Sequence, residues 1–282
     1  MSIVVQPSGQ ACGAAVTGVD LRAPLDAAVV AEIRAAWLQH QVLSFPNQKL
    51  TDDDLERFSR YFGEFGEDPF IQPIAGREHI LAVKRLATEQ GPIFAEAWHT
   101  DWSFQALPPA GTCLFGITVP PSGGDTLFAN QQLALEAMPA ELRARIDGLQ
   151  ARHSAEVAYA PEGLYGETDR QQGRSMDILT SEEAKAAQLH PLVRRHRETG
   201  REAVYGCFGY IVGIEGMAQA EATELLLDLY TWQTQEQFQY RHRWQADTLL
   251  MWDNRAVLHM ATGGYEGHDR LLHRTTIADE RA

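Results

Sequence analysis

The sequence has few cysteines, no long apolar run and a deficit of positive charge. Its three cysteines, Cys12, Cys113 and Cys207, lie far apart, whereas disulfide frameworks and zinc ribbons need paired, closely spaced cysteines. No run approaches the roughly 18 apolar residues of a bilayer span, and the amino terminus lacks the basic region and apolar core of a signal peptide. We therefore expect an unprocessed, cytoplasmic protein with no membrane partner.

Acidic residues outnumber basic ones, with 38 Asp and Glu against 24 Lys and Arg, and the formal net charge is −14. Such a chain repels a phosphate backbone, so we expect no nucleic-acid partner. The 282 residues can bury a sizeable core, and no Ser/Gly-rich linker divides them. We expect one domain over residues 1–282, assembled as a homo-oligomer.

Apolar periodicity predicts three helices. Val29, Ile33 and Trp37 are spaced four residues apart, which places them on one helical stripe. Thr51 precedes three aspartates and an apolar stripe, which is typical of a helix N-cap. A third helix is expected over residues 218–238, where leucines recur at helical spacing.

Short β-type runs occupy much of the remaining chain. They read "TCLFGITV", "DTLFA", "DTLLMW", "AVLHMA" and "RLLHRTTIA". Because these runs do not alternate regularly with helices, they favour an antiparallel β core decorated by helices, a mostly β fold. Glycines and charges interrupt any apolar period around residues 155–180, where we expect a long loop or lid.

The stretch "AWHTDWSF" places His99 and Asp101 two residues apart in an apolar setting. In an extended segment both side chains point to the same face. A surface histidine beside a turn aspartate would give the same pair. Further along, His259 ends an apolar run after a turn. Two histidines and one carboxylate form the facial set that binds Fe(II) and leaves coordination positions open.

Two arginines follow His259 in the expected strand "RLLHRTTI". Strand alternation places Arg270 and Arg274 on the same face. Two buried guanidinium groups are costly without anionic partners, so this face should meet carboxylates from the protein or from a ligand. An exposed sheet face with arginines paired to nearby acids is the alternative.

Taken together, these motifs resemble the Fe(II)- and 2-oxoglutarate-dependent dioxygenases, and within them the taurine dioxygenase family. Matching stretches run in order along nearly the whole chain. They are "GAAVTGVDL", "LQHQVLSFPNQ", "WHTDWSF", "PPAGT", "GGDTLF", "WDNRAVLH" and "HRTTI". The resemblance implies a double-stranded β-helix, or jelly-roll, core wrapped by helices.

The resemblance also implies roles for individual residues. Arg270 and Thr126 would hold the distal carboxylate of 2-oxoglutarate, and a planar guanidinium beside a neutral hydroxyl suits that task. Arg274 would lie beside the cofactor and reach the anionic group of the substrate. The implied iron ligands are His99, Asp101 and His259.

The implied reaction uses 2-oxoglutarate and dioxygen as co-substrates and hydroxylates an unactivated C–H bond. Asp101 leaves no ligand position free for a halide, which disfavours halogenation. Two alternatives are a catalytically silent metal-binding jelly roll and a zinc hydrolase with the same ligands. A structural metal site is normally closed by four protein ligands, and a hydrolase has no use for Arg270.

Departures from the family pattern concern the substrate. Asp68 stands where we expect the sulfonate-binding histidine of taurine dioxygenases, and Ile71 and Ala95 replace a tyrosine and an asparagine. The resulting hypothesis is a small organic acid other than taurine: a sulfonate, sulfate ester, aryloxy acid or other carboxylic acid. Its body would lie against Ile71, Trp102 and Phe104. Alternatively, Asp68 turns to solvent or pairs with Arg77.

Overall fold

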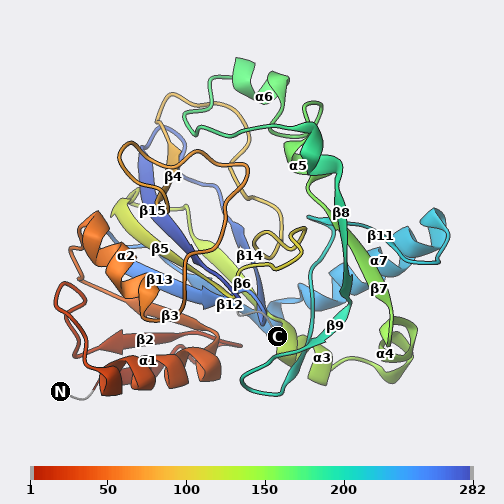
Figure 1. The fold of residues 1–282 in the computed structure, drawn as a ribbon, viewed down its shortest axis with the longest axis horizontal. Helices are drawn as coiled ribbons and strands as arrows, with labels where there is room; N and C mark the ends of the chain where they lie inside the picture. Colours follow the sequence, from red (N-terminus) through yellow and green to blue (C-terminus); the bar gives the residue numbers. More distant parts are fainter. Residues whose placement is uncertain (1–2, 280–282) are drawn as a thin grey trace.

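The computed structural model describes residues 3–279 of the predicted domain, and residues 1, 2 and 280–282 lie outside this range. The fold is mostly β with helices around it, as predicted (Figure 1). The largest layer is a seven-stranded sheet in which neighbours are antiparallel except for β2 and β3. Its strands, in spatial order, are β1 (Val4–Pro7), β2 (Ala14–Thr17), β3 (Val42–Phe45), β13 (Thr248–Asp253), β5 (Gly111–Thr118), β15 (Arg270–Ile277) and β4 (Leu81–Arg85).

A second, three-stranded sheet packs against the inner face of the first. Its order is β12 (Gln239–His242), β6 (Thr126–Asn130) and β14 (Val257–Ala261). Side chains from both sheets share one apolar cluster, which includes Leu114, Phe128, Tyr240, Leu250, Trp252, Val257 and Leu272. Each of the five expected β-type runs therefore becomes a strand of one of these two sheets.

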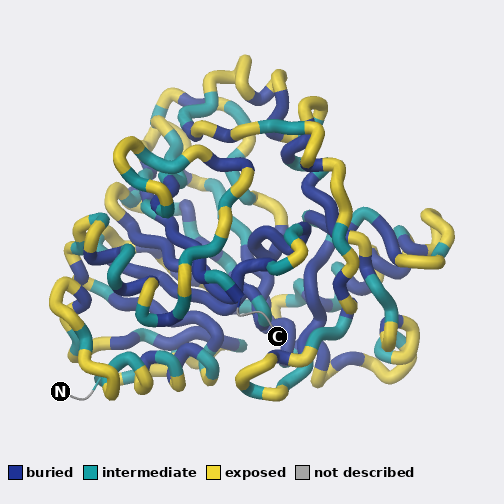
Figure 2. The backbone as a smooth tube through the Cα atoms, in the orientation of Figure 1, coloured by how far each residue is buried: buried dark blue, intermediate teal, exposed yellow. Residues whose placement is uncertain are grey.

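Helices α1 (Ala27–His40) and α2 (Asp52–Arg60) cover the outer face of the large sheet. Alternation along β5 explains how one strand serves both faces. Cys113 and Phe115 belong to the cluster under the helices, whereas Leu114 between them belongs to the cluster between the sheets. Buried backbone follows the sheets, and exposed backbone gathers on outer turns and helices (Figure 2).

The remaining elements form a flank beside the two sheets (Figure 1). Its sheets are β11 (Ile211–Ile214) with β7 (Gln150–Ser154) and β8 (Ala187–Pro191), and β10 (Glu202–Val204) with β9 (Val193–Arg195). Its helices are α3 (Gln131–Glu136), α4 (Ala140–Ile146), α5 (Glu156–Tyr159), α6 (Glu167–Gln171), α7 (Gln219–Gln233) and the short 3-10 helices Glu182–Lys185 and Glu236–Phe238. None of the helices within residues 3–279 is both long and apolar enough to cross a membrane.

The third predicted helix is shorter than expected. α7 ends at Gln233 rather than continuing to Phe238. The hydroxyl of Thr234 donates to the carbonyl of Tyr230 at 2.7 Å, and the backbone of Gln235 is extended. This side-chain bond competes with helix continuation. Phe238 is nevertheless buried, because the following 3-10 turn returns it to the core.

The predicted N-cap at Thr51 is confirmed and supports a test of helix stability. Thr51 Oγ1 accepts from the backbone N–H of Asp54, and the Asp54 carboxylate accepts from the backbone N–H of Thr51 at 2.9 Å. Because Thr51→Ala removes one half of this capping box, it should lower the free energy of unfolding by about 1 kcal/mol. Urea unfolding followed by circular dichroism measures the loss.

Asp26→Ala is the matched control for this experiment. Asp26 is the N-cap of α1, but its side chain makes no capping hydrogen bond. Its loss should therefore cost less than half as much as the loss of Thr51. Equal losses for the two variants would show that the capping box adds nothing to stability.

Candidate active site

His99 and His259 converge because their backbones pair. His99 N–H donates to His259 O at 3.0 Å, and His259 N–H donates to His99 O at 2.8 Å. Residues opposite each other in an antiparallel pair point to the same face.

The stretch from His99 to Trp102 is not extended throughout, however. Asp101 and Trp102 form a turn in which Trp102 has φ +48°, so the prediction of one extended run is wrong beyond Thr100.

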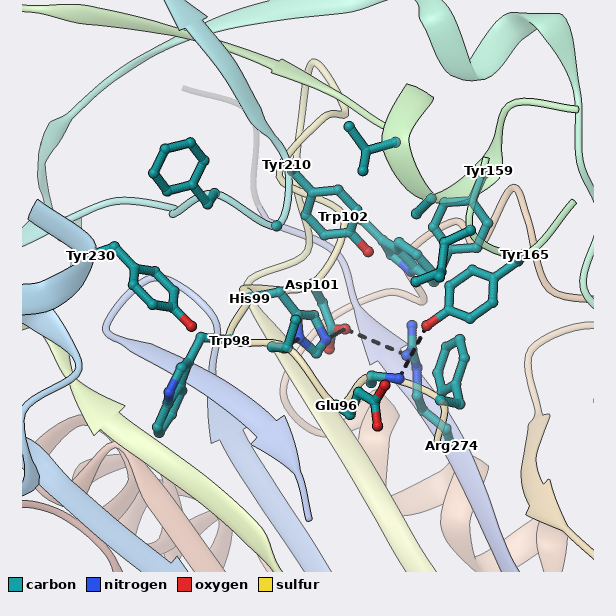
Figure 3. A pocket seen from close by; sticks show the side chains of 18 of the residues that line it. Glu96, Trp98, His99, Asp101, Trp102, Tyr159, Tyr165, Tyr210, Tyr230 and Arg274 are labelled. Atoms are coloured by element: carbon teal, nitrogen blue, oxygen red, sulfur yellow. Dashed lines mark hydrogen bonds and ion pairs between the residues drawn. The ribbon is translucent and has the colours of Figure 1, made fainter. Parts of the chain in front are cut away.

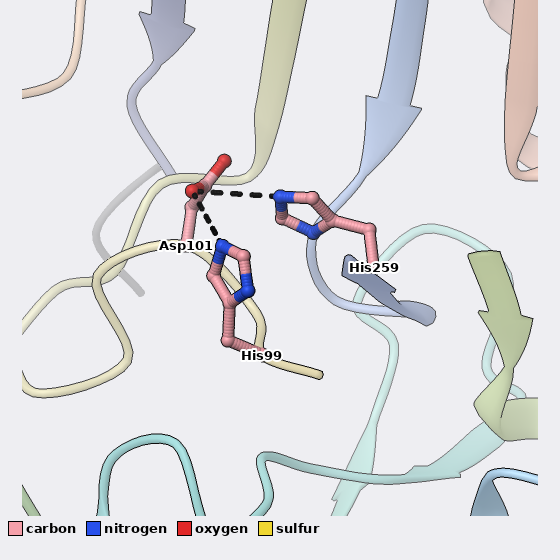
Figure 4. Close-up of side chains that lie close together, drawn as sticks. All are labelled: His99, Asp101 and His259. Atoms are coloured by element: carbon pink, nitrogen blue, oxygen red, sulfur yellow. Dashed lines mark ion pairs between the residues drawn. The ribbon is translucent and has the colours of Figure 1, made fainter. Parts of the chain in front are cut away.

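The Asp101 carboxylate nevertheless meets both imidazoles (Figure 4). Its Oδ1 lies 3.8 Å from His99 Nε2 and 3.8 Å from His259 Nε2. One ligand atom from each residue lies within 4.8 Å of the other two. Two nitrogens and one oxygen on one side of a cavity can hold a single divalent metal ion.

The charge states of the three groups suit a metal. Burial opposes ionisation of Asp101, but Arg274 and both histidines outweigh burial and lower the pKa of Asp101 to about 2. Burial lowers the pKa of His259 to about 3 and also lowers the pKa of His99. At neutral pH the site therefore presents one carboxylate and two neutral imidazoles, which are the forms that bind metals.

Further hydrogen bonds orient these groups. His99 Nδ1 lies 2.9 Å from Ala97 O, which places the ring proton on Nδ1 and leaves Nε2 free for a metal. Thr112 Oγ1 donates to Asp101 Oδ2 at 2.6 Å and accepts from Asn254 Nδ2 at 2.9 Å. The supporting partners lie on neighbouring strands or turns, so the sheet itself holds the candidate ligands in place.

Arg270 lines a smaller pocket that His99 and His259 also line. It is buried, and Nη2 donates to Gly124 O at 3.3 Å, but Nε has no hydrogen-bond partner among residues 3–279. Burial lowers its pKa, and Tyr265 and Asp125 offset this only in part. A buried guanidinium without a paired carboxylate is costly unless a ligand supplies one.

Thr126 lines the same pocket as Arg270. Its Oγ1 accepts from Trp244 Nε1 at 2.9 Å, so its own hydroxyl proton is free to donate. The neighbouring Gly124 has φ +67°, and a Cβ there would lie 3.3 Å from Arg270 Nε. The absence of a side chain at Gly124 therefore lets this turn approach the guanidinium closely.

Arg274 lies between this pocket and a larger cavity, and it is paired within the protein. Its Nη2 lies 2.6 Å from Asp68 Oδ1, and its Nη1 lies 3.4 Å from Asp101 Oδ1. Burial opposes its charge, but the two carboxylates raise its pKa above the ordinary range. Arg77, the alternative partner of Asp68, instead pairs with Asp53 and Glu56.

The larger cavity has a volume of about 370 Å³ and opens beside the candidate ligands (Figure 3). Trp102 lines it, as expected. Ile71 and Phe104 do not line it; they pack behind the wall in the same apolar cluster as Trp102, which corrects their expected contact with substrate. The polar and aromatic side chains that face the cavity include Glu96, Trp98, Tyr159, Tyr165, Tyr210 and Tyr230.

Sequence reasoning missed these tyrosines. Tyr159 and Tyr165 lie in the glycine-rich stretch predicted to be a long loop or lid, and Tyr210 follows a Gly-Cys-Phe-Gly stretch. The available signal was the tyrosine content of "VAYAPEGLYG", because tyrosine is unusual in a loop that stays in solvent.

Comparison with known proteins agrees with this geometry. Residues 5–276 match the family described as taurine catabolism dioxygenase TauD, TfdA family. The chain belongs to this family. It is 34% identical to the alpha-ketoglutarate-dependent 2,4-dichlorophenoxyacetate dioxygenase of Cupriavidus pinatubonensis, over 99% of both chains. It is also 34% identical to the alpha-ketoglutarate-dependent sulfate ester dioxygenase of Pseudomonas putida, over 99% of this chain and 91% of that protein.

A solved structure supports the same assignment. The taurine dioxygenase from Burkholderia xenovorans superposes with a TM-score of 0.81 at 33% identity, over 99% of this chain and 90% of the other. This protein is therefore a 2-oxoglutarate-dependent non-haem iron dioxygenase that uses Fe(II), 2-oxoglutarate and dioxygen. The silent jelly roll and the zinc hydrolase are not favoured.

The candidate metal ligands can be tested by direct binding. Asp101→Ala and His259→Ala should each weaken Mn(II) binding by roughly 100-fold or more, since losing a ligand costs more than losing a supporting partner. Both should abolish Fe(II)-dependent turnover and leave the circular dichroism spectrum unchanged. His79→Ala, a partly exposed histidine elsewhere, is the control. Full activity in either ligand variant would contradict the assignment.

Proposed function

We propose that His99, Asp101 and His259 hold Fe(II), that 2-oxoglutarate lies between the metal and Arg270, and that the substrate occupies the aromatic cavity. The observation that carries this proposal is Arg270, a buried guanidinium with no carboxylate partner among the described residues, in a pocket that also reaches His99 and His259. Succinate formation from 2-oxoglutarate, stimulated by a small organic acid, tests it.

The pocket that Arg270 lines offers hydrogen-bond donors for one carboxylate of the cofactor. Arg270 and Thr126 offer it one charged and one neutral donor, and apolar side chains such as Val83, Leu114 and Trp252 line the same pocket. A short carbon chain therefore fits between the guanidinium and the metal ligands. Charge-assisted hydrogen bonds to Arg270 would fix the cofactor's orientation.

Fe(II), 2-oxoglutarate and dioxygen together supply the oxidising chemistry, which converts 2-oxoglutarate to succinate and carbon dioxide and places one oxygen atom on a C–H bond. The chain's own residues bind, orient and exclude water. Asp101 and the histidines remain in their metal-binding protonation states at neutral pH. The aromatic walls keep the reacting carbon in an apolar cavity.

The substrate class follows from this cavity and from the relatives, whose names include a chlorinated aryloxy acid and sulfate esters. The enzyme hydroxylates a C–H bond of a small organic acid. We infer that its acid group lies near Arg274 and that an aryl or branched alkyl body fills the space between Trp102 and the tyrosines. Taurine is too small and too polar to fill this cavity.

Residues 155–180 are proposed to act as a lid. Tyr159 and Tyr165 from this segment form part of the inner wall, while Val157 and Leu164 at the rim are 59% and 56% exposed. Leu227 of α7 faces the same cavity and is 52% exposed. Closing the segment towards α7 would bury these side chains around a bound substrate.

We also propose a double-stranded β-helix core, a single domain, a homo-oligomer and a cytoplasmic location. The packing of the seven-stranded sheet on the three-stranded sheet supports a double-stranded β-helix core. A single domain fits the shared apolar clusters, which join the large sheet to the second sheet on one face and to α1 and α2 on the other. Homo-oligomer formation, a cytoplasmic location and the absence of a nucleic-acid partner rest on the sequence-based expectations given above.

The role of Arg270 predicts a change in cofactor affinity. Arg270→Gln should raise the KM for 2-oxoglutarate by 10-fold to 100-fold, because a charge-assisted hydrogen bond is worth roughly 1.5–3 kcal/mol. Initial rates of succinate formation measure it. Arg241→Gln, a partly exposed arginine paired with Asp125, should leave the KM unchanged. An unchanged KM in Arg270→Gln would shift the role to Arg274.

The apolar cavity predicts a substrate order. Acids with an aryl or branched alkyl body should give higher kcat/KM than taurine, because burying apolar surface stabilises their complexes. A panel of sulfonates, sulfate esters, aryloxy acids and amino acids in the succinate assay measures this order. The highest kcat/KM for taurine would refute the cavity argument.

A further inference from the structure

Asp68 lies behind the only arginine or lysine that lines the aromatic cavity, among the described residues. That residue, Arg274, contacts Asp68 at 2.6 Å and Asp101 at 3.4 Å. If Asp101 binds the metal, its negative charge is shared between the metal ion and Arg274. Asp68 has no such task, and Arg274 is the only charged group paired with it among the described residues.

Asp68 is buried and held in place behind two residues of the cavity wall, Trp102 and Arg274. Its side chain is 8% exposed. Trp102 Nε1 donates to Oδ1, and Thr276 Oγ1 donates to Oδ2 at 3.0 Å. The Arg274 guanidinium lies 4.7 Å from the centre of the Trp102 ring. Three donors from separate positions thus hold this carboxylate, which therefore does not move freely into solvent.

The ion pair with Asp68 affects the positive charge of Arg274 more than its capacity to donate hydrogen bonds. Its guanidinium has five N–H donors, of which Asp68 and Asp101 each take one, and Nε has no partner within residues 3–279. Arg274 can therefore still donate hydrogen bonds to a substrate. Its positive charge, however, is already offset by Asp68, and the charge of that carboxylate behind the guanidinium would also repel a substrate anion bound at Arg274.

We propose that Asp68 is a specificity-determining residue, which lowers the contribution of the substrate's negative charge to binding and leaves its apolar body as the main determinant of affinity. This inference rests on the proposed function, because it assumes that the substrate's acid group lies at Arg274. Arg274 then orients the acid rather than attracting it strongly, so small anions with little apolar surface are rejected.

The test compares an acid with its uncharged amide. The acid is the best substrate from the panel above, and the second probe is its primary amide. Equilibrium binding is measured calorimetrically with Mn(II) and N-oxalylglycine in place of Fe(II) and 2-oxoglutarate, so that no turnover occurs. Asp68→Asn removes the charge and keeps the shape. It should lower the Kd of the acid 10-fold or more and change the Kd of the amide less than threefold.

Three further variants distinguish the effect of the Asp68 charge from the effect of its hydrogen bonds. Glu67→Gln removes a neighbouring exposed charge and should change neither Kd. Thr276→Val weakens the support of Asp68 but keeps its charge, so the ratio of the two Kd values should stay as in the wild type. Asp68→Ser replaces Asp68→Asn if that variant does not fold.

Equal shifts for acid and amide in Asp68→Asn, or no shift for either, would overturn the inference and leave Asp68 as a support for Arg274. Succinate formation by the wild type is measured in parallel. If no acid stimulates it, the proposed function fails. If an acid does stimulate it and the ratio of Kd values stays constant, only the inference about Asp68 fails.

Discussion

The site depends on two hydrogen bonds between the backbones of His99 and His259. They attach an irregular segment to the edge of β14, which is itself paired with β6. A loop would otherwise lose considerable conformational entropy on being ordered, and nothing local would direct its side chains. Paired with a strand, His99 takes its orientation from the sheet, and the turn after it only has to bring Asp101 across.

Charge balance is the second constraint on this interior. β15 presents two buried arginines to the space between the sheets, and they are balanced differently. Arg274 is paired with two carboxylates of the chain, whereas Arg270 has no carboxylate within salt-bridge distance among the described residues. One face of β15 therefore carries one guanidinium that is compensated within the protein and a second guanidinium that is not. A dicarboxylate cofactor suits the second position.

Local patterns in the sequence predicted the elements well. The run "TCLFGITV" was expected to be a strand and forms β5, and Thr51 marked a helix start. The three candidate ligands could be named because two histidines and one carboxylate form a known metal-binding set and because several motifs in order along the chain resemble one family. The end of α7 was misplaced because a single threonine side chain bond stops the helix.

Contacts between distant segments could not be predicted in this way. Asp68 and Arg274 are far apart in the chain, and no periodicity relates them. The tyrosines of the cavity lie in loops, whose positions depend on the whole fold. Sequence reasoning placed Ile71 and Phe104 in the cavity for the same reason, although both pack one layer behind it.

The hydrogen bond from Thr112 to Asp101 also gives the two carboxylate oxygens different partners. One oxygen faces both imidazoles, and the other is engaged by a hydroxyl that Asn254 holds in turn. Asp101 thus has one oxygen left to offer a metal ion. If His99, Asp101 and His259 hold the metal as proposed, each would offer it one atom, and the side of the ion that faces the cavity would remain open to small molecules.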